Sequence, residues 1–179
     1  LANEIKNKMQ NNPDFISRNI QTSSGIVELF FLKSMVDKTA IAKEIISPVL
    51  DYKEKFTFDD ITTKIIRVAD VKEIKSDEIV DEILKNHVIF AFDNKFLTID
   101  LEKYPVRTPS EPPTSPNIYG PREGFVEAIS TNISLIRKRL SSRNLKIENF
   151  VVGRETNTKV SIIYLKNIAS KEIVKEITS

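Results

Sequence analysis

Helical spacing of apolar residues occurs in four segments within the first hundred residues. Apolar side chains three or four positions apart line one face of an amphipathic helix. This spacing is present at residues 3–10 and again after each of three residues that suit a helix cap. The three capping residues are Asp37, Thr57 and Ser76. The pattern therefore predicts a short first helix and a further helix after each cap.

Three short apolar runs have the length and the flanking turn residues of buried strands. They lie at residues 25–32, 88–92 and 96–99. The last two are joined by residues 93–95 (Asp-Asn-Lys), which predicts a hairpin. Residues 14–18 fit a strand or a helix on pattern alone. Because strands and helices alternate along the chain, the sequence predicts an α/β fold with mixed α+β sheets.

A cluster of prolines interrupts these patterns. Six of the eight prolines lie between Pro105 and Pro121. Proline restricts φ and lacks a backbone N–H, so a dense run favours a stiff, extended segment. We interpret residues 105–117 as a linker that joins two small subdomains, residues 1–104 and residues 118–179.

The clearest amphipathic helix of the chain follows the linker. Its apolar stripe runs from Phe125 to Leu140 and contains one polar residue, Asn132. A buried amide needs hydrogen-bond partners, and the nearest loop, residues 120–124, supplies backbone groups. We therefore expect Asn132 to anchor that loop. Strands are predicted at residues 145–152 and 159–165, and a closing helix is predicted with Ser170 as its cap.

The end of the chain resembles its beginning. Residues 32–38 (LKSMVDK) align with residues 165–171 (LKNIASK), and upstream residues 14–16 parallel residues 149–151 with an offset of two. Each block is predicted as helix, strand, strand, helix, which favours a strand at residues 14–18. The pattern indicates a pseudo-repeat in which residues 53–104 are an insertion in the first copy. Chance similarity between two strand-to-helix turns is the alternative.

Composition argues against familiar enzyme and metal chemistry. The chain has 179 residues, no Cys, one His and four Gly. Disulfides, zinc–thiolate sites and Cys nucleophiles are excluded, and a phosphate-binding Gly-rich loop is disfavoured. No catalytic motif accompanies the single histidine, His87, which we interpret as structural. We expect no catalytic residues, no cofactor and no metal. No apolar run approaches the ~18 residues of a membrane span, and the absence of Met before Leu1 indicates an excised piece.

Charge is divided unequally between the two predicted subdomains. Residues 1–117 carry 16 Lys+Arg and 19 Asp+Glu, a net −3, whereas residues 118–179 carry 11 and 6, a net +5. Arg137, Lys138 and Arg139 form a basic patch near the end of the long helix, where cations complement the helix dipole. Contact with anionic lipid or an acidic protein surface is the alternative. Without interleaved aromatic residues for base stacking, nucleic-acid binding is not expected.

Two of the four glycines enclose a short charged segment at the start of the second subdomain. The string GPREGF comprises Gly120, Pro121, Arg122, Glu123, Gly124 and Phe125. Its glycines and proline favour a conformationally specific turn that leads into the helix. Arg122 and Glu123 would then project with defined geometry. A docking or hinge element and an ordinary helix entry both fit this pattern.

The GPREGF string and the residues after it resemble the GerA family of spore-forming bacteria. The resemblance also rests on residues 131–133 (TNI), 135–140 (LIRKRL), 152–154 (VGR), 158–160 (TKV) and 168–169 (IA), and it extends over the whole chain. It adds Arg154 to the candidate interaction or hinge residues. The sequence departs from the family pattern at Lys138, where Arg is usual, and at Ser34 and Asn167, where Gly is usual. These departures weaken the case for each basic residue individually.

The resemblance implies the soluble N-terminal domain of the A subunit of a nutrient germinant receptor, or of a SpoVAF-type relative. Such a domain precedes a membrane domain and faces the cytoplasm, the spore core, at the inner spore membrane. The implied partners are the chain's own membrane domain, receptor B and C subunits, further A subunits and an anionic membrane surface. The implied function is signalling and receptor assembly. The alternatives are sensing of a small germinant in a cleft between the subdomains and, less favoured, nucleic-acid binding.

Overall fold

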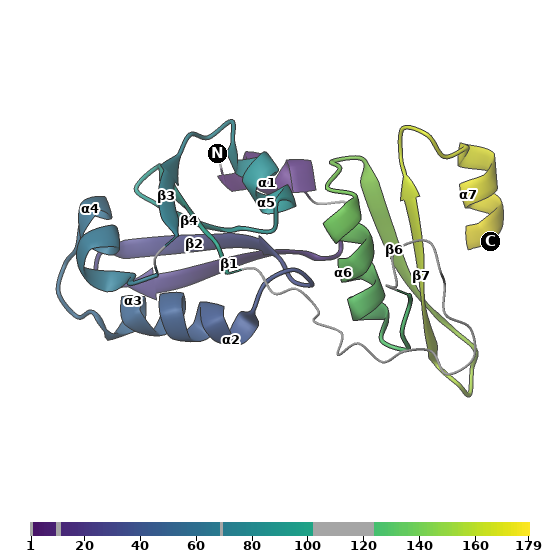
Figure 1. Ribbon diagram of the computed structural model, residues 1–179, viewed down its shortest axis with the longest axis horizontal. Helices are drawn as coiled ribbons and strands as arrows, with labels where there is room; N and C mark the ends of the chain where they lie inside the picture. The colour runs from purple at the N-terminus through teal and green to yellow at the C-terminus, as the bar shows by residue number, and fades with distance from the viewer. Residues whose placement is uncertain (1, 10–11, 69, 102–123) are drawn as a thin grey trace, which may run out of the picture.

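The computed structural model describes residues 2–9, 12–68, 70–101 and 124–179. The described chain forms two units, each built on its own antiparallel sheet (Figure 1). The predicted linker, residues 105–117, and the first four residues of GPREGF, 120–123, lie outside the described residues. Among the described residues, no helix combines the length and the apolar character that crossing a bilayer demands.

A five-stranded antiparallel sheet forms the first unit, with the strand order β1-β2-β4-β5-β3. The strands are β1 (Phe15–Thr22), β2 (Gly25–Leu32), β3 (Val71–Ile74), β4 (Val88–Phe92) and β5 (Lys95–Ile99). The predicted strands at 25–32, 88–92 and 96–99 are confirmed. Residues 15–18 belong to β1, and Asp14 lies in the turn before it. Asp93 and Asn94 make the β4–β5 turn with φ of 51° and 57°, as a two-residue hairpin requires.

Helices cover both faces of this sheet because its central strands are apolar on both sides. Alternate residues of β2 enter different cores: Leu29 and Phe31 on one face, Phe30 and Leu32 on the other. The first face is covered by α2 (Lys38–Ala40), η1 (Ile41–Ile46), α3 (Ser47–Asp51), α4 (Phe58–Asp60) and η2 (Ile61–Ile65). The second is covered by α1 (Ala2–Met9) and α5 (Ile79–Leu84).

Two of the three predicted helix caps are confirmed. The Asp37 carboxylate accepts hydrogen bonds from the backbone N–H groups of Thr39 and Ala40 at 2.8 and 3.2 Å. Thr57 and Asp60 form a reciprocal capping box. The prediction for Ser76 was wrong, since α5 begins at Ile79 and Glu78 occupies the cap position. A turn precedes the helix there, and the Glu78 carboxylate accepts the backbone N–H of Lys75 at 2.8 Å.

The second unit has the element order α6 (Ile129–Arg139), β6 (Leu145–Val152), β7 (Thr158–Leu165) and α7 (Lys171–Thr178). Both predicted strands and the closing helix are present. Ser170 occupies the N-cap position of α7, but its side chain makes no capping hydrogen bond. The long helix begins later than its apolar stripe suggested: Phe125 lies before α6 and is 72% exposed. Figure 1 shows α6 between the first unit and the β6–β7 hairpin, with α7 on the far side of the hairpin.

The turns after β2 and β7 have the same pattern of backbone hydrogen bonds, each within its own unit. In the first unit the Lys33 N–H donates to the Asp14 carbonyl at 2.8 Å, and in the second the Lys166 N–H donates to the Asn144 carbonyl at 2.9 Å. Leu32 and Leu165 each accept an N–H from three residues further on. The geometry therefore matches the alignment of residues 32–38 with 165–171.

The upstream half of the internal alignment was wrong in register. Asp14 corresponds in hydrogen bonding to Asn144 and not to Asn149. The side chain two residues earlier confirms this, because Asn12 accepts the Asp14 N–H and Ser142 accepts the Asn144 N–H, each at 3.2 Å. A duplication of the whole helix-strand-strand-helix block stays a prediction.

Candidate functional site

The described candidate residues cluster around α6, apart from Arg154. Gly124 and Phe125 are exposed just before the helix, and Arg154 is exposed on the turn between β6 and β7. Asn132 is half-buried: its Nδ2 donates to the Val126 carbonyl at 2.7 Å, and its Oδ1 accepts the Val126 N–H at 2.8 Å. Asn132 thus anchors the segment that enters the helix, at a position two residues after the expected loop.

Arg137 is buried against the first unit, whereas sequence analysis had placed it in a surface patch. Only 3% of the residue is exposed. Its Nη2 donates to Asn12 Oδ1 at 2.6 Å, and its Nε lies 3.3 Å from Asp14 Oδ2. Burial lowers the pKa of Arg137 from its ordinary value, and the Asp14 carboxylate opposes that shift. Arginine nevertheless stays protonated at physiological pH, so this is a buried ion pair.

Asp14 and Ser34 complete the network on the first unit. The backbone N–H and the hydroxyl of Ser34 donate to the two Asp14 carboxylate oxygens at 3.0 and 2.5 Å. The Ser134 hydroxyl, one turn before Arg137 on α6, donates to the Ser34 carbonyl at 2.7 Å. One face of α6 therefore meets the start of β1 and the turn after β2 through charged and neutral hydrogen bonds together.

The remaining basic residues of this region stay at the surface. Lys138 and Arg139 are exposed. Arg143 forms a second link between the units, with its Nη2 2.5 Å from Asp81 Oδ1, but both side chains are more than half exposed. An exposed pair of this kind contributes about 0–1 kcal/mol. The buried Arg137 network is therefore the stronger of the two links.

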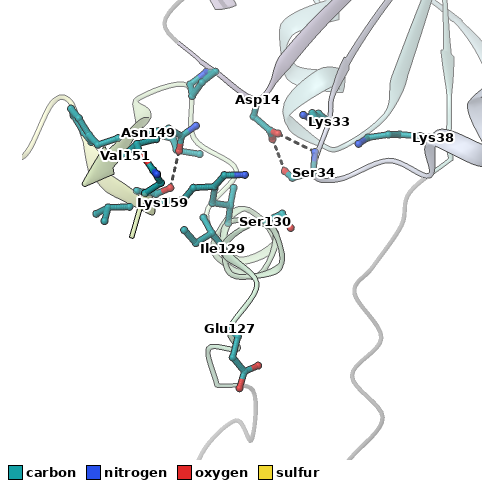
Figure 2. Close-up of a pocket in the computed structure, with 17 residues that line it drawn as sticks. Asp14, Lys33, Ser34, Lys38, Glu127, Ile129, Ser130, Asn149, Val151 and Lys159 are labelled. Atoms are coloured by element: carbon teal, nitrogen blue, oxygen red, sulfur yellow. Dashed lines mark hydrogen bonds between the residues drawn. The ribbon is translucent and has the colours of Figure 1, made fainter. Parts of the chain in front are cut away.

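A cleft of about 830 Å³ opens beside this network, between the two units (Figure 2). Lys33 and Lys38 reach it from the first unit, and Lys159 and Glu127 from the second. Asn149 and Ser161 also line it and are hydrogen-bonded to each other at 2.7 Å. Cationic, anionic and neutral polar groups thus surround one space, an arrangement that suits a small polar molecule. Across the described ranges, no group of His, Asp and Glu side chains has the spacing of a metal site.

Sequence reasoning missed Asp14, Ser34 and Ser134 as parts of a site. The only signal was the position of Arg137, four residues after Ile133 on the buried stripe of α6. Because residues 137–139 are all basic, the i, i+4 spacing of Arg137 from Ile133 did not stand out in the sequence. The single histidine has a structural contact, since His87 Nδ1 lies 2.7 Å from Glu82 Oε2.

The fold and the junction define a two-unit α/β module in which a helix of one unit is held against the other by a buried arginine. The model of the Bacillus/Clostridium GerA spore germination protein family matches residues 3–179. The chain therefore belongs to this family. Membership supports a role in spore germination.

Named relatives agree with this assignment. Spore germination protein XA of Bacillus anthracis is 34% identical over 163 residues, covering 87% of this chain and 33% of that protein. Stage V sporulation protein AF of Bacillus subtilis (strain 168) is 30% identical over 163 residues, covering 86% of this chain and 33% of that protein. The chain thus spans about a third of these relatives.

A solved structure has the same fold. The N-terminal domain of the A subunit of the Bacillus megaterium spore germinant receptor GerK3 superposes with a TM-score of 0.69 at 20% identity. The match covers 98% of this chain and 67% of that one. The predicted mixed α/β class is confirmed, and both sheets are antiparallel.

Proposed function

We propose that the chain acts in signalling and receptor assembly as the cytosolic N-terminal domain of a germinant receptor A subunit. Its family and its structural relative support this assignment. The observation that carries the proposal is the buried network of Arg137, Asp14, Ser34 and Ser134. A buried ion pair restricts how α6 can move against the first unit, because separating the two charges would leave each buried without its partner. A movement of one unit is therefore transmitted to the other.

The surface around the start and end of α6 is where we place the partner contacts. Phe125 is exposed at one end, and Lys138 and Arg139 are exposed at the other. The proposed partners are the membrane domain of the same protein, receptor B and C subunits, further A subunits and an anionic membrane surface. The proposed location is the spore-core side of the inner spore membrane. No catalytic role is proposed, and a SpoVAF-type role is the alternative within the family.

Replacing Arg139 or Arg122 by Ala is expected to block nutrient germination or receptor assembly without unfolding the domain. Arg139 is exposed, so its loss should change the free energy of unfolding by no more than about 0.5 kcal/mol. The measurement is germination of spores carrying each variant, together with receptor level and thermal unfolding of the purified domain. Lys171→Ala, an exposed basic residue on α7, is the matched control. Normal germination of both variants at wild-type receptor level would contradict the proposal.

Direct ligand sensing is the second candidate function, and the polar cleft favours it. Lys33, Lys159 and Glu127 offer both charges to a small polar germinant. Calorimetric titration of the chain with amino acids and sugars is expected to give saturable heat that Lys159→Ala weakens. Lys171→Ala, which leaves the cleft unchanged, should titrate like the wild type. If no candidate nutrient gives saturable heat, the sensing proposal is wrong and the proposal of signalling and assembly stands alone.

A further inference from the structure

A second depression of about 310 Å³ lies at the junction and is lined by α1, α5 and the start of β6. Four cationic residues line it: Lys8 from α1, Arg143 and Lys146 from the segment that enters β6, and Lys166 from the turn after β7. Beneath them lie the buried side chains of Met9, Val80, Leu84 and Leu145. We call this the basic groove. It combines a cationic rim with an apolar floor and is formed by both units.

Among the residues that the structure describes, no carboxylate lines the basic groove itself. The cations have acidic neighbours outside the groove: Lys8 pairs with Glu4 at 2.9 Å and Arg143 with Asp81 at 2.5 Å at the surface, and Lys146 pairs with the half-buried Glu148 at 3.7 Å. For Lys8 and Arg143, both members of the pair are more than half exposed. Exposed pairs contribute about 0–1 kcal/mol, so an incoming anion can exchange with them. The groove therefore presents usable positive charge.

The equivalence of the two turns indicates what kind of partner such a surface receives. In the first unit the turn is covered by a helix, because the Asp14 carboxylate forms an ion pair with Arg137 and the Ser34 carbonyl accepts the Ser134 hydroxyl of α6. In the second unit Asn144 stands at the position of Asp14, next to Arg143 and Lys166. The carboxylate that receives a cationic side chain is replaced by a neutral amide flanked by cations. The second turn suits a helix of the opposite charge.

We propose that the basic groove binds an acidic amphipathic helix of a partner protein. The apolar face of that helix would cover Met9, Leu84 and Leu145, and its carboxylates would meet Lys8, Arg143, Lys146 and Lys166. Charge complementarity sets the specificity of such an interface. Met9, Leu84 and Leu145 are already buried, so their contact with the helix adds shape complementarity and little apolar burial. Because α1 and α5 belong to one unit and β6 to the other, the bound helix bridges the junction beside the Arg137 network. This inference goes beyond the proposed role of α6 and is tested separately from germination.

The test is a titration of the ¹⁵N-labelled chain with a synthetic 16-residue helix-forming peptide that carries a Leu stripe and Glu on its polar face. The matched peptide has Lys at every Glu position. We expect saturable amide shifts at residues 8–9, 142–146 and 166 with the acidic peptide and none there with the Lys peptide. The double variant Arg143→Ala/Lys166→Ala should bind about tenfold or more weakly. Lys171→Ala/Lys175→Ala removes the same charge on α7 and should bind like the wild type.

Four outcomes of this titration would contradict the binding of an acidic helix. Equal binding of the Lys peptide, unchanged affinity of the groove variant or no saturable shift would overturn the proposal. So would binding of phosphatidylglycerol vesicles or duplex DNA that requires Arg143 and Lys166 when the acidic peptide does not bind, since the groove would then serve lipid or nucleic acid. The amide spectrum of each variant reports its folding in the same experiment. Germination defects in Arg139 variants are independent of this readout.

Discussion

Replacing Arg137 by Ala is expected to lower the free energy of unfolding by about 3–5 kcal/mol, because the partner charge is left buried. Arg137 is 3% exposed, and the Asp14 side chain that it meets is 12% exposed. In the variant the Asp14 carboxylate keeps its hydrogen bonds from Ser34 but loses the Arg137 cation. Urea unfolding at pH 7, followed by circular dichroism, measures the change.

The control for this experiment is Arg139→Ala, two positions further along α6 and exposed. It should change the free energy of unfolding by no more than about 0.5 kcal/mol. The double variant Asp14→Asn/Arg137→Met removes both charges and is expected to be more stable than Arg137→Ala, since no isolated charge remains buried. If Arg137→Ala were as stable as Arg139→Ala, the ion pair would not hold the junction.

Phe30→Ala is expected to destabilise the chain by about 3–5 kcal/mol, as for other large aromatic side chains deleted from a core. Phe30 has no exposed surface and lies in the core beneath α1 and α5. Its ring stacks on Phe15 at a centroid distance of 6.2 Å, one residue from Asp14. The cavity would therefore loosen the strand that carries the junction as well as the core. The midpoint of urea unfolding should fall without a change in slope.

Ile26→Ala is the matched control on the same strand. Ile26 is 54% exposed, so little apolar surface returns to water when it is truncated. Its effect should stay within about 0.5 kcal/mol. A loss of less than about 1 kcal/mol for Phe30→Ala would contradict the packing described for this face of the sheet.

Prediction from sequence succeeded where short-range patterns decide the structure. The run at residues 25–32 is apolar on both faces, and such a run forms a central strand wherever helices can cover both sides. Asp37 and Thr57 cap helices with backbone groups only two or three residues away. The strand at 71–74 was not predicted, because its two apolar residues in four positions give little signal without the partner strand β5.

The junction shows the limit of that approach. Residues 137–139 read as three equivalent cations, yet Arg137 is buried and Lys138 and Arg139 are exposed. Its partners, Asn12 and Asp14, stand more than 120 residues away in the chain. No local pattern contains information about a contact of that separation.

Local patterns of apolar, capping and turn residues were therefore enough to predict the element order of the second unit, most elements of the first unit except β3 and, through the GPREGF string, the family. Only the tertiary packing of one unit on the other decided which cation on α6 forms the buried ion pair with Asp14. The same packing left the turn after β7 open as part of the basic groove. The physical reason is that burial converts a surface charge into one that must find a partner, and burial is a property of the assembled fold.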